Sequence, residues 1–169
     1  GLNRIDPSEQ EDIILLSHFH YDHVFGLPYF LAKKRRGCVT LATACANSRE
    51  NFAMKLSNIF GGIGFPVTLF DIYEDLELVT GHQTQLMSLG AWQIESIALN
   101  HPGGSMGYSV THRNTDKRIC YLMDHEHSPS YDAKALAQFA NSADLVIYDA
   151  AYSDESYRPH EGYGHSTIE

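Results

Sequence analysis

Apolar residues fall into short blocks along the chain, and the spacing within each block separates strands from helices. Continuous apolar runs at 12–17, 38–43 and 144–150 predict buried strands, because a strand covered on both faces loses the alternation of polar and apolar positions. Five further segments also predict strands, namely 66–72, 84–89, 92–99, 107–113 and 117–124. The Asn-Thr-Asp stretch at 114–116 suits a hairpin turn between the last two.

Apolar positions three and four residues apart predict three helices. Residues 47–62 carry the clearest pattern, with Asn47 or Ser48 as the N-cap and Gly61 and Gly62 at the end. Residues 22–34 predict a helix interrupted near Gly26 and Pro28, and residues 128–143 predict another. Helices and strands therefore alternate, which predicts layered α/β packing in one domain, with several strands antiparallel.

Composition indicates an ordinary globular protein. The 169 residues are 43% hydrophobic and 20% charged, and no apolar run is long enough to span a bilayer. No basic start followed by an apolar stretch suggests a secretory signal. Cys38, Cys45 and Cys120 are odd in number and lack metal-type CxxC spacing, so we expect reduced thiols in a cytoplasmic protein.

The net charge of −9 disfavours nucleic acid as a partner, since nucleic-acid binding normally needs clustered Lys and Arg. The one basic cluster, residues 32–37, is predicted to be the solvated end of a helix. Histidine is the unusual component: the chain has 10, and histidine is the commonest metal ligand.

The stretch HFHYDH places four potential metal ligands directly after the apolar run at 12–17: His18, His20, Asp22 and His23. If the chain stays extended through His20, then His18 and His20 point to the same side, because strand side chains alternate. Imidazole nitrogen and carboxylate oxygen together suit a borderline metal such as zinc. The alternative is a set of solvated loop histidines, which would bring repulsion when protonated and no gain without a metal.

This stretch resembles the His-x-His-x-Asp-His signature of the metallo-β-lactamase-fold hydrolases, and the resemblance continues in order along nearly the whole chain. LNHPGGSMGYSV (99–110) resembles the family's third motif, and ICYLMDHEH (119–127) resembles its fourth. DLVIYDAAYSDESY and GYGHST resemble the phosphodiesterase branch, which includes tRNA 3′-end-processing endoribonucleases and cyclic-phosphodiester hydrolases. The resemblance implies an α/β (α+β) fold, the αββα sandwich, over residues 1–169.

The resemblance also implies the site. His18, His20 and His101 would hold one metal, Asp22 and His23 a second, and Asp124 would bridge the two. The expected cofactor is Zn²⁺, one or two ions, with Mn²⁺ or Fe²⁺ as alternatives. Asp22 and His165 would assist catalysis by moving protons, while a metal-activated water attacks phosphorus.

Several nearby side chains keep two interpretations from sequence alone. His125 and His127 are not expected to be direct ligands, although one could orient a ligand. Asp149 could support the site or cap a turn. His160 is expected to be a surface histidine that could substitute as a ligand. The Gly-Gly-Ser turn at 103–105 is a weak candidate anion site.

The expected function is a dinuclear phosphodiesterase acting on a small cyclic or linear phosphodiester. The acidic chain and the short hairpin between His101 and Asp124 favour a small substrate over tRNA. The alternatives are a tRNA 3′-processing-type endoribonuclease and a catalytically degenerate metal-binding regulatory module. Di-iron reductases of the same fold are disfavoured, because they carry His-x-Glu-x-Asp instead.

Two segments of the family pattern are missing from this sequence. Family members begin with strands that precede the first histidine motif, and their final ligand histidine follows a further helix and strand. We therefore expect a fold incomplete at both termini and a sequence that is a fragment of a longer protein. An exposed sheet edge would be covered by a homo-oligomer or by the missing segments.

Overall fold

The computed structural model describes residues 2–81, 87–128, 131 and 133–168. The chain divides into two compact units, an N-terminal unit (1–82) and a C-terminal unit (83–169). Each unit is built on its own sheet. Among the described residues, no helix is long and apolar enough to cross a membrane. All three cysteines are free thiols.

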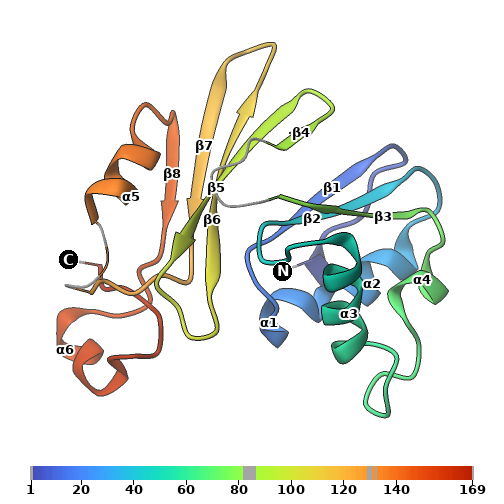
Figure 1. Ribbon diagram of the computed structural model, residues 1–169, viewed down its shortest axis with the longest axis horizontal. Helices are drawn as coiled ribbons and strands as arrows, with labels where there is room; N and C mark the ends of the chain where they lie inside the picture. Colours follow the sequence, from blue (N-terminus) through green and yellow to red (C-terminus); the bar gives the residue numbers. More distant parts are fainter. Residues whose placement is uncertain (1, 82–86, 129–130, 132, 169) are drawn as a thin grey trace. The chain divides into compact units, whose positions relative to one another are not determined.

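The N-terminal unit is a parallel three-stranded sheet with helices along one side (Figure 1). Its strands are ordered β1 (Asp12–Leu16), β2 (Val39–Thr43) and β3 (Leu76–Thr80). The helical elements are η1 (Leu2–Arg4), α1 (Tyr21–Val24), α2 (Gly26–Lys33), α3 (Arg49–Ile59) and α4 (Leu69–Ile72). Leu16 and Leu41 from the strands pack with Leu27, Phe52 and Phe60 from the helical side to form the core.

Most predicted elements of this unit are confirmed within a few residues. The helix predicted over 22–34 is indeed interrupted, because Phe25 separates α1 from α2. The helix predicted over 47–62 is α3, and the Ser48 side chain accepts a hydrogen bond from the Asn51 amide as its N-cap.

The strand predicted over 66–72 is wrong. Residues 69–72 form the helix α4, and the strand lies further on, at β3. The physical reason is a capping box: the Asp71 amide donates to Thr68 Oγ1 (3.2 Å), and the Thr68 amide donates to Asp71 Oδ2 (2.7 Å). These two bonds satisfy backbone amides at the start of the turn, which favours a helix over an extended run.

The basic cluster at 32–37 is also only partly as predicted. Arg35 and Arg36 are exposed, but the Lys34 side chain is fully buried. Lys34 Nζ donates to Asp12 Oδ2 at 2.6 Å and to the Ser8 carbonyl at 2.9 Å. Lys34 is therefore not solvated, because its ammonium group finds a carboxylate and carbonyl oxygens at the start of β1.

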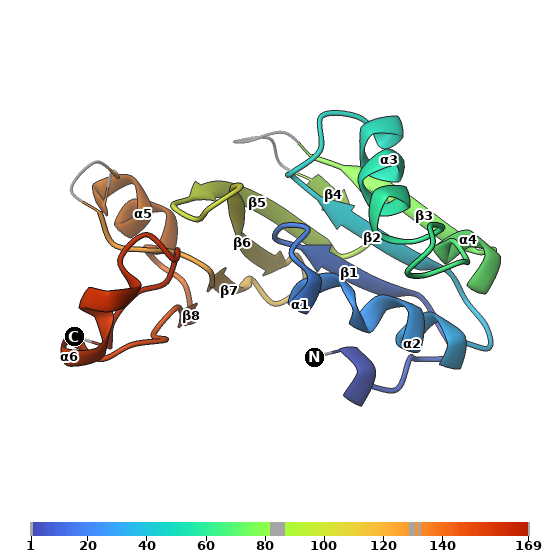
Figure 2. The same cartoon turned by 90° about the horizontal axis from the view of Figure 1, so that it is seen from below.

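The C-terminal unit is a five-stranded sheet in sequence order. Strands β4 (Met87–Leu89), β5 (Trp92–Leu99), β6 (Ser105–His112) and β7 (Lys117–Leu122) are antiparallel, and β8 (Leu145–Tyr148) is parallel to β7. Helix α5 (Ala133–Ala140) lies beside β8 (Figure 2) and packs Leu136 against Cys120 and Leu122. Two short elements follow, α6 (Asp154–Tyr157) and η2 (Arg158–His160).

The sequence predicted the positions of the strands of this unit and the hairpin turn at 114–116, which lies between β6 and β7. The strand predicted to be buried at 144–150 is instead largely exposed: in β8, Leu145, Val146 and Ile147 are 50%, 42% and 40% exposed, because β8 is an edge strand of the sheet. Residues 84–86 of the strand predicted at 84–89 lie outside the described residues, as do 129, 130 and 132 of the helix predicted at 128–143. The parallel pairing of β7 with β8 follows from the crossover through α5.

Candidate metal centre

The first group of candidate ligands follows the carboxyl end of β1 in the N-terminal unit. Thr43 Oγ1, at the end of β2, donates to the Leu16 carbonyl at 2.9 Å. Cys45 Sγ donates to the Ser17 carbonyl at 2.8 Å, and burial raises the pKa of Cys45 to about 11. These bonds fix the end of β1 just before the histidines begin.

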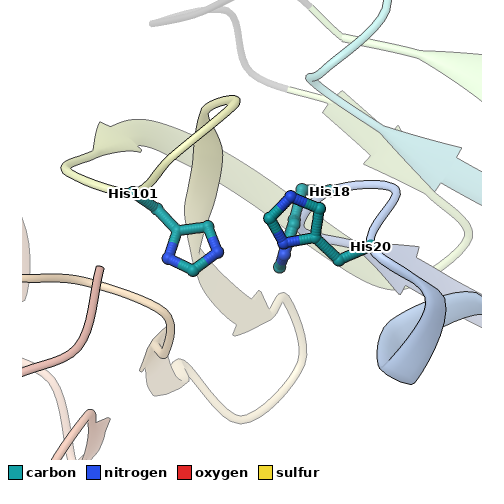
Figure 3. A group of neighbouring side chains, drawn as sticks. All are labelled: His18, His20 and His101. Carbon is teal, nitrogen blue, oxygen red and sulfur yellow. The ribbon is translucent and has the colours of Figure 1, made fainter. Parts of the chain in front are cut away.

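His18 and His20 lie on the same side of the chain, as the predicted alternation requires. Their rings meet edge to face with centroids 4.5 Å apart (Figure 3). Phe19, between them, instead contacts Phe52 of the core, with ring centroids 5.7 Å apart. The apolar contact of Phe19 thus turns both histidines away from the core.

Asp22 and His23 join this group from the first turn of α1. The His23 ring lies 4.2 Å from the His18 ring, centroid to centroid. His23 Nε2 lies 3.2 Å from Asp22 Oδ2, and the Asp22 side chain is exposed. The N-terminal unit therefore gathers its four predicted ligands at one strand end, with the rings of His20 and His23 beside His18.

The second group lies at the ends of β5 and β7 in the C-terminal unit. His101 follows β5, on the loop where Figure 3 labels it, and Asp124 follows β7 with a left-handed φ of 58°. His101 Nε2 is 3.6 Å from Asp124 Oδ2. His101, Asp124 and His165 each offer a ligand atom within 4.8 Å of the others.

Asp149, which follows β8, holds this second group together. Its Oδ2 lies 2.7 Å from His165 Nδ1 and accepts the Asp124 amide at 2.9 Å. Its Oδ1 accepts the amides of Ala151 and Ser166, each at 3.2 Å. Asp149 is almost fully buried. Both sequence interpretations of Asp149 are therefore met, because it accepts turn amides and also orients His165.

His125 and His127 serve neighbouring structure. The Asn100 amide donates to His125 Nδ1 at 3.1 Å, which requires that nitrogen to be unprotonated. Burial and the nearby His127 lower the pKa of His125 to about 4, although the Asp149 and Glu126 carboxylates act to raise it. His127 Nε2 contacts the Tyr148 hydroxyl at 2.9 Å. His160 stacks on Tyr152, with ring centroids 4.7 Å apart.

Two residues near the site were not singled out from sequence, Glu126 and Gly164. The Glu126 carboxylate accepts the Tyr157 hydroxyl and the amides of Gly162 and Gly164. The Gly164 carbonyl in turn lies 2.9 Å from His101 Nδ1. Burial acts to raise the pKa of Glu126, but the three hydrogen bonds outweigh it and lower the pKa. The hydrogen bond to Glu126 also raises the pKa of Tyr157 to about 12.

The donor chemistry fits a divalent metal. Both groups combine imidazole nitrogens with carboxylate oxygen, the mixture that zinc and other borderline transition metals accept. In the C-terminal unit, a second layer of polar groups holds both histidines, by a backbone carbonyl at His101 and a carboxylate at His165. Such outer partners are typical of metal-binding histidines.

Comparisons with known proteins identify the family and the fold. A profile of the beta-lactamase superfamily domain matches residues 3–169. No curated protein sequence matches the chain. Yeast PDE1, unliganded, superposes with a TM-score of 0.69 at 14% identity, covering 92% of this chain and 48% of that one.

Two further crystal structures superpose over nearly the whole chain. A diphosphatase from the PhnP family gives a TM-score of 0.63 at 21% identity, covering 95% of this chain and 53% of that one. Human tRNase Z, short form, gives 0.62 at 19% identity, covering 99% of this chain and 66% of that one. The chain thus spans roughly half to two thirds of the length of these structures, and the identities support a shared fold.

Proposed function

The chain belongs to the beta-lactamase superfamily and has the predicted metallo-β-lactamase fold, and on that premise we propose that it is a metal-dependent phosphodiesterase. The observation that carries the proposal is the group formed by His101, Asp124 and His165, whose ligand atoms lie within 4.8 Å of one another. His101 and Asp124 are proposed ligands, whereas His165 contacts the buried Asp149 carboxylate, as a catalytic acid would.

We propose that these residues are metal ligands, as the family signature implies: His18, His20 and His101 would hold one ion, Asp22 and His23 would hold a second, and Asp124 would contribute to both. The metal is Zn²⁺ in this proposal, with Mn²⁺ and Fe²⁺ as alternatives. When bound, such ions supply a water of lowered pKa and neutralise negative charge on a phosphoryl oxygen.

The chain's own residues then transfer protons. Asp22, exposed on the first turn of α1, accepts a proton from the attacking water. His165 donates a proton to the leaving oxygen, because its Nδ1 is committed to Asp149 and its Nε2 remains for the substrate side. Asp149 stabilises the positive imidazolium, as the aspartate of a catalytic triad does.

A small phosphodiester is the proposed substrate. The β5–β6 and β6–β7 connections are the short loops 100–104 and 113–116, so no long arm separates His101 from Asp124. The net charge of −9 would also repel the tRNA phosphate backbone. The diphosphatase and PDE1 matches are consistent with this class. The three free thiols support a reducing, cytoplasmic location.

The test combines metal analysis with turnover. Purified protein is assayed for bound metal and for hydrolysis of bis(p-nitrophenyl) phosphate, before and after chelation and after adding back Zn²⁺, Mn²⁺ or Fe²⁺. We expect turnover that chelation abolishes and one of the metals restores. Asp124→Asn should remove both metal and turnover, whereas Glu161→Gln, an exposed acid of the same unit, should leave both unchanged.

The alternatives predict different results when cyclic phosphodiesters and a tRNA precursor are assayed as further substrates. Turnover that is insensitive to chelation contradicts the proposal. Stoichiometric metal without turnover of this ester or of cyclic phosphodiesters favours the binding module. Cleavage of a tRNA precursor, with no turnover of small esters, favours the endoribonuclease.

A further inference from the structure

Glu126 links three segments that carry the proposed site. Its carboxylate holds the turn at 162–164, its backbone is paired with Asn100, and it lies two residues after Asp124. We propose that Glu126 is a positioning residue that acts through the Gly164 carbonyl to fix the orientation and tautomer of His101. This inference rests on the proposed function, because His101 is there a metal ligand.

The carboxylate of Glu126 accepts hydrogen bonds from the turn at 162–164 and from Tyr157 at the end of α6. Oε1 accepts the Tyr157 hydroxyl and the Gly162 amide, both at 2.6 Å, and Oε2 accepts the Gly164 amide at 2.9 Å. The residue is 6% exposed. Three charge-assisted hydrogen bonds on a buried carboxylate define the path of this turn more tightly than solvent-exposed contacts would.

The backbone of Glu126 also holds the loop that carries His101. The Glu126 amide donates to the Asn100 carbonyl, and Asn100 Nδ2 donates to the Glu126 carbonyl, each at 2.8 Å. Residue 126 thus contacts the residue before His101 and, through its side chain, the turn that lies against the His101 ring. The distance between His101 and Gly164 is set from both sides by the same residue.

The Gly164 carbonyl decides which nitrogen of His101 carries the proton. It lies 2.9 Å from Nδ1, and a carbonyl can only accept, so Nδ1 must donate. A neutral imidazole protonated at Nδ1 has its lone pair at Nε2, the nitrogen that faces Asp124. Moving the carbonyl would remove the preference for this tautomer and leave part of the population with the wrong nitrogen protonated.

The test compares Glu126→Gln with Glu161→Gln. Both remove one negative charge within the same unit, but Glu161 is exposed. In Glu126→Gln, the amide NH₂ must face either the Gly164 amide or the Tyr157 and Gly162 donors, so one donor meets another. Side-chain ¹⁵N NMR of the metal-free protein reports the His101 tautomer, and chelator competition reports Zn²⁺ affinity.

We expect the wild type and Glu161→Gln to show His101 protonated at Nδ1. Glu126→Gln should give a mixture of tautomers and bind Zn²⁺ about 10- to 100-fold more weakly. If Glu126→Gln does not fold, Tyr157→Phe removes only one of the three bonds and should shift the tautomer in the same direction. A folded variant with an unchanged His101 tautomer overturns the inference.

The two proposals can fail separately. A wild type that binds no metal overturns the proposed function, but the tautomer in the metal-free protein still tests Glu126. A wild type that binds metal, beside a Glu126→Gln variant with the same tautomer and affinity, overturns only the positioning role.

Discussion

Gly164→Ala is the sharpest single perturbation of the candidate site, because the structure supplies its own control. A Cβ at Gly164 would lie 2.2 Å from His101 Nδ1 and 2.4 Å from Pro102 Cδ. A Cβ at Gly162, on the same turn, would meet nothing within 4 Å. The two glycines have nearly the same φ, +86° and +88°. Comparing the two alanine variants therefore separates backbone strain from the collision with His101.

The magnitudes follow from these distances. Left-handed backbone costs a non-glycine residue roughly 1–2 kcal/mol, and both variants carry that cost. In Gly164→Ala, the new Cβ would lie 2.2 Å from His101 Nδ1, whereas an ordinary contact begins at 3.4 Å. The two atoms must therefore move apart by about 1 Å. A shift of about 1 Å is well beyond the roughly 0.2 Å tolerance of a metal–ligand distance, so Zn²⁺ affinity should fall. Hydrogen bonds to His125 and Glu126 fix Asn100, the residue before His101, so we expect the His101 ring to move instead of the backbone.

The assay is Zn²⁺ affinity by chelator competition, alongside urea unfolding of both variants. We expect similar losses of unfolding free energy from the shared strain, with a further loss in Gly164→Ala from the overlap. Zn²⁺ affinity should fall at least 10-fold in Gly164→Ala and stay near wild type in Gly162→Ala. Equal Zn²⁺ affinity for the two folded variants would refute the argument that Gly164 is a glycine in order to admit the His101 ring.

Three further outcomes follow from buried charges. Lys34→Met should lower the free energy of unfolding by about 3 kcal/mol in urea, because it leaves Asp12 with no ammonium partner; an unchanged midpoint would contradict this. Burial acts to raise the pKa of Asp12, but hydrogen bonds from Lys34 and Ser8 outweigh burial and lower it. The ionised Asp12 carboxylate should therefore stabilise the fold above pH 3.8, and this stabilisation should be lost as the pH falls further. In Lys34→Met that acid-side loss should become smaller, because only the hydrogen bonds from Ser8 still lower the pKa of Asp12; urea unfolding at several pH values measures it. Asp149→Asn should reduce kcat about 10²-fold or more with an intact fold by circular dichroism, because His165 loses its carboxylate partner; full activity would rule out the role of Asp149.

The grouping of the first set of candidate ligands could be predicted because it is local. His18, Phe19 and His20 alternate along an extended segment, so period-two reasoning gives their directions without any tertiary information. The family resemblance likewise located His101, Asp124 and His165, which the C-terminal unit brings together.

The supporting residues could not be predicted in the same way. His101 and Gly164 are 63 residues apart, and Glu126 meets Gly162 across 36, so no local pattern reports either contact. The error at 66–72 had a different origin. The apolar run there predicts a strand, although Thr68 and Asp71 have the spacing of a capping box. Local polar chemistry decided that segment against its hydrophobic pattern.

The two histidines of the C-terminal unit have different partners, and the difference separates their proposed roles. His101 Nδ1 meets a backbone carbonyl, whereas His165 Nδ1 meets the buried carboxylate of Asp149. A neutral carbonyl selects the tautomer but adds no charge to stabilise a proton on the second nitrogen, which suits a neutral metal ligand. A carboxylate in the same position stabilises a positive ring, which suits a proton donor. Because Glu126 acts on His101 only through the carbonyl of Gly164, its negative charge holds the turn without contacting the ring. Of the buried carboxylates Asp149 and Glu126, only Asp149 contacts a histidine ring directly, which is why we propose the proton-donating role for His165.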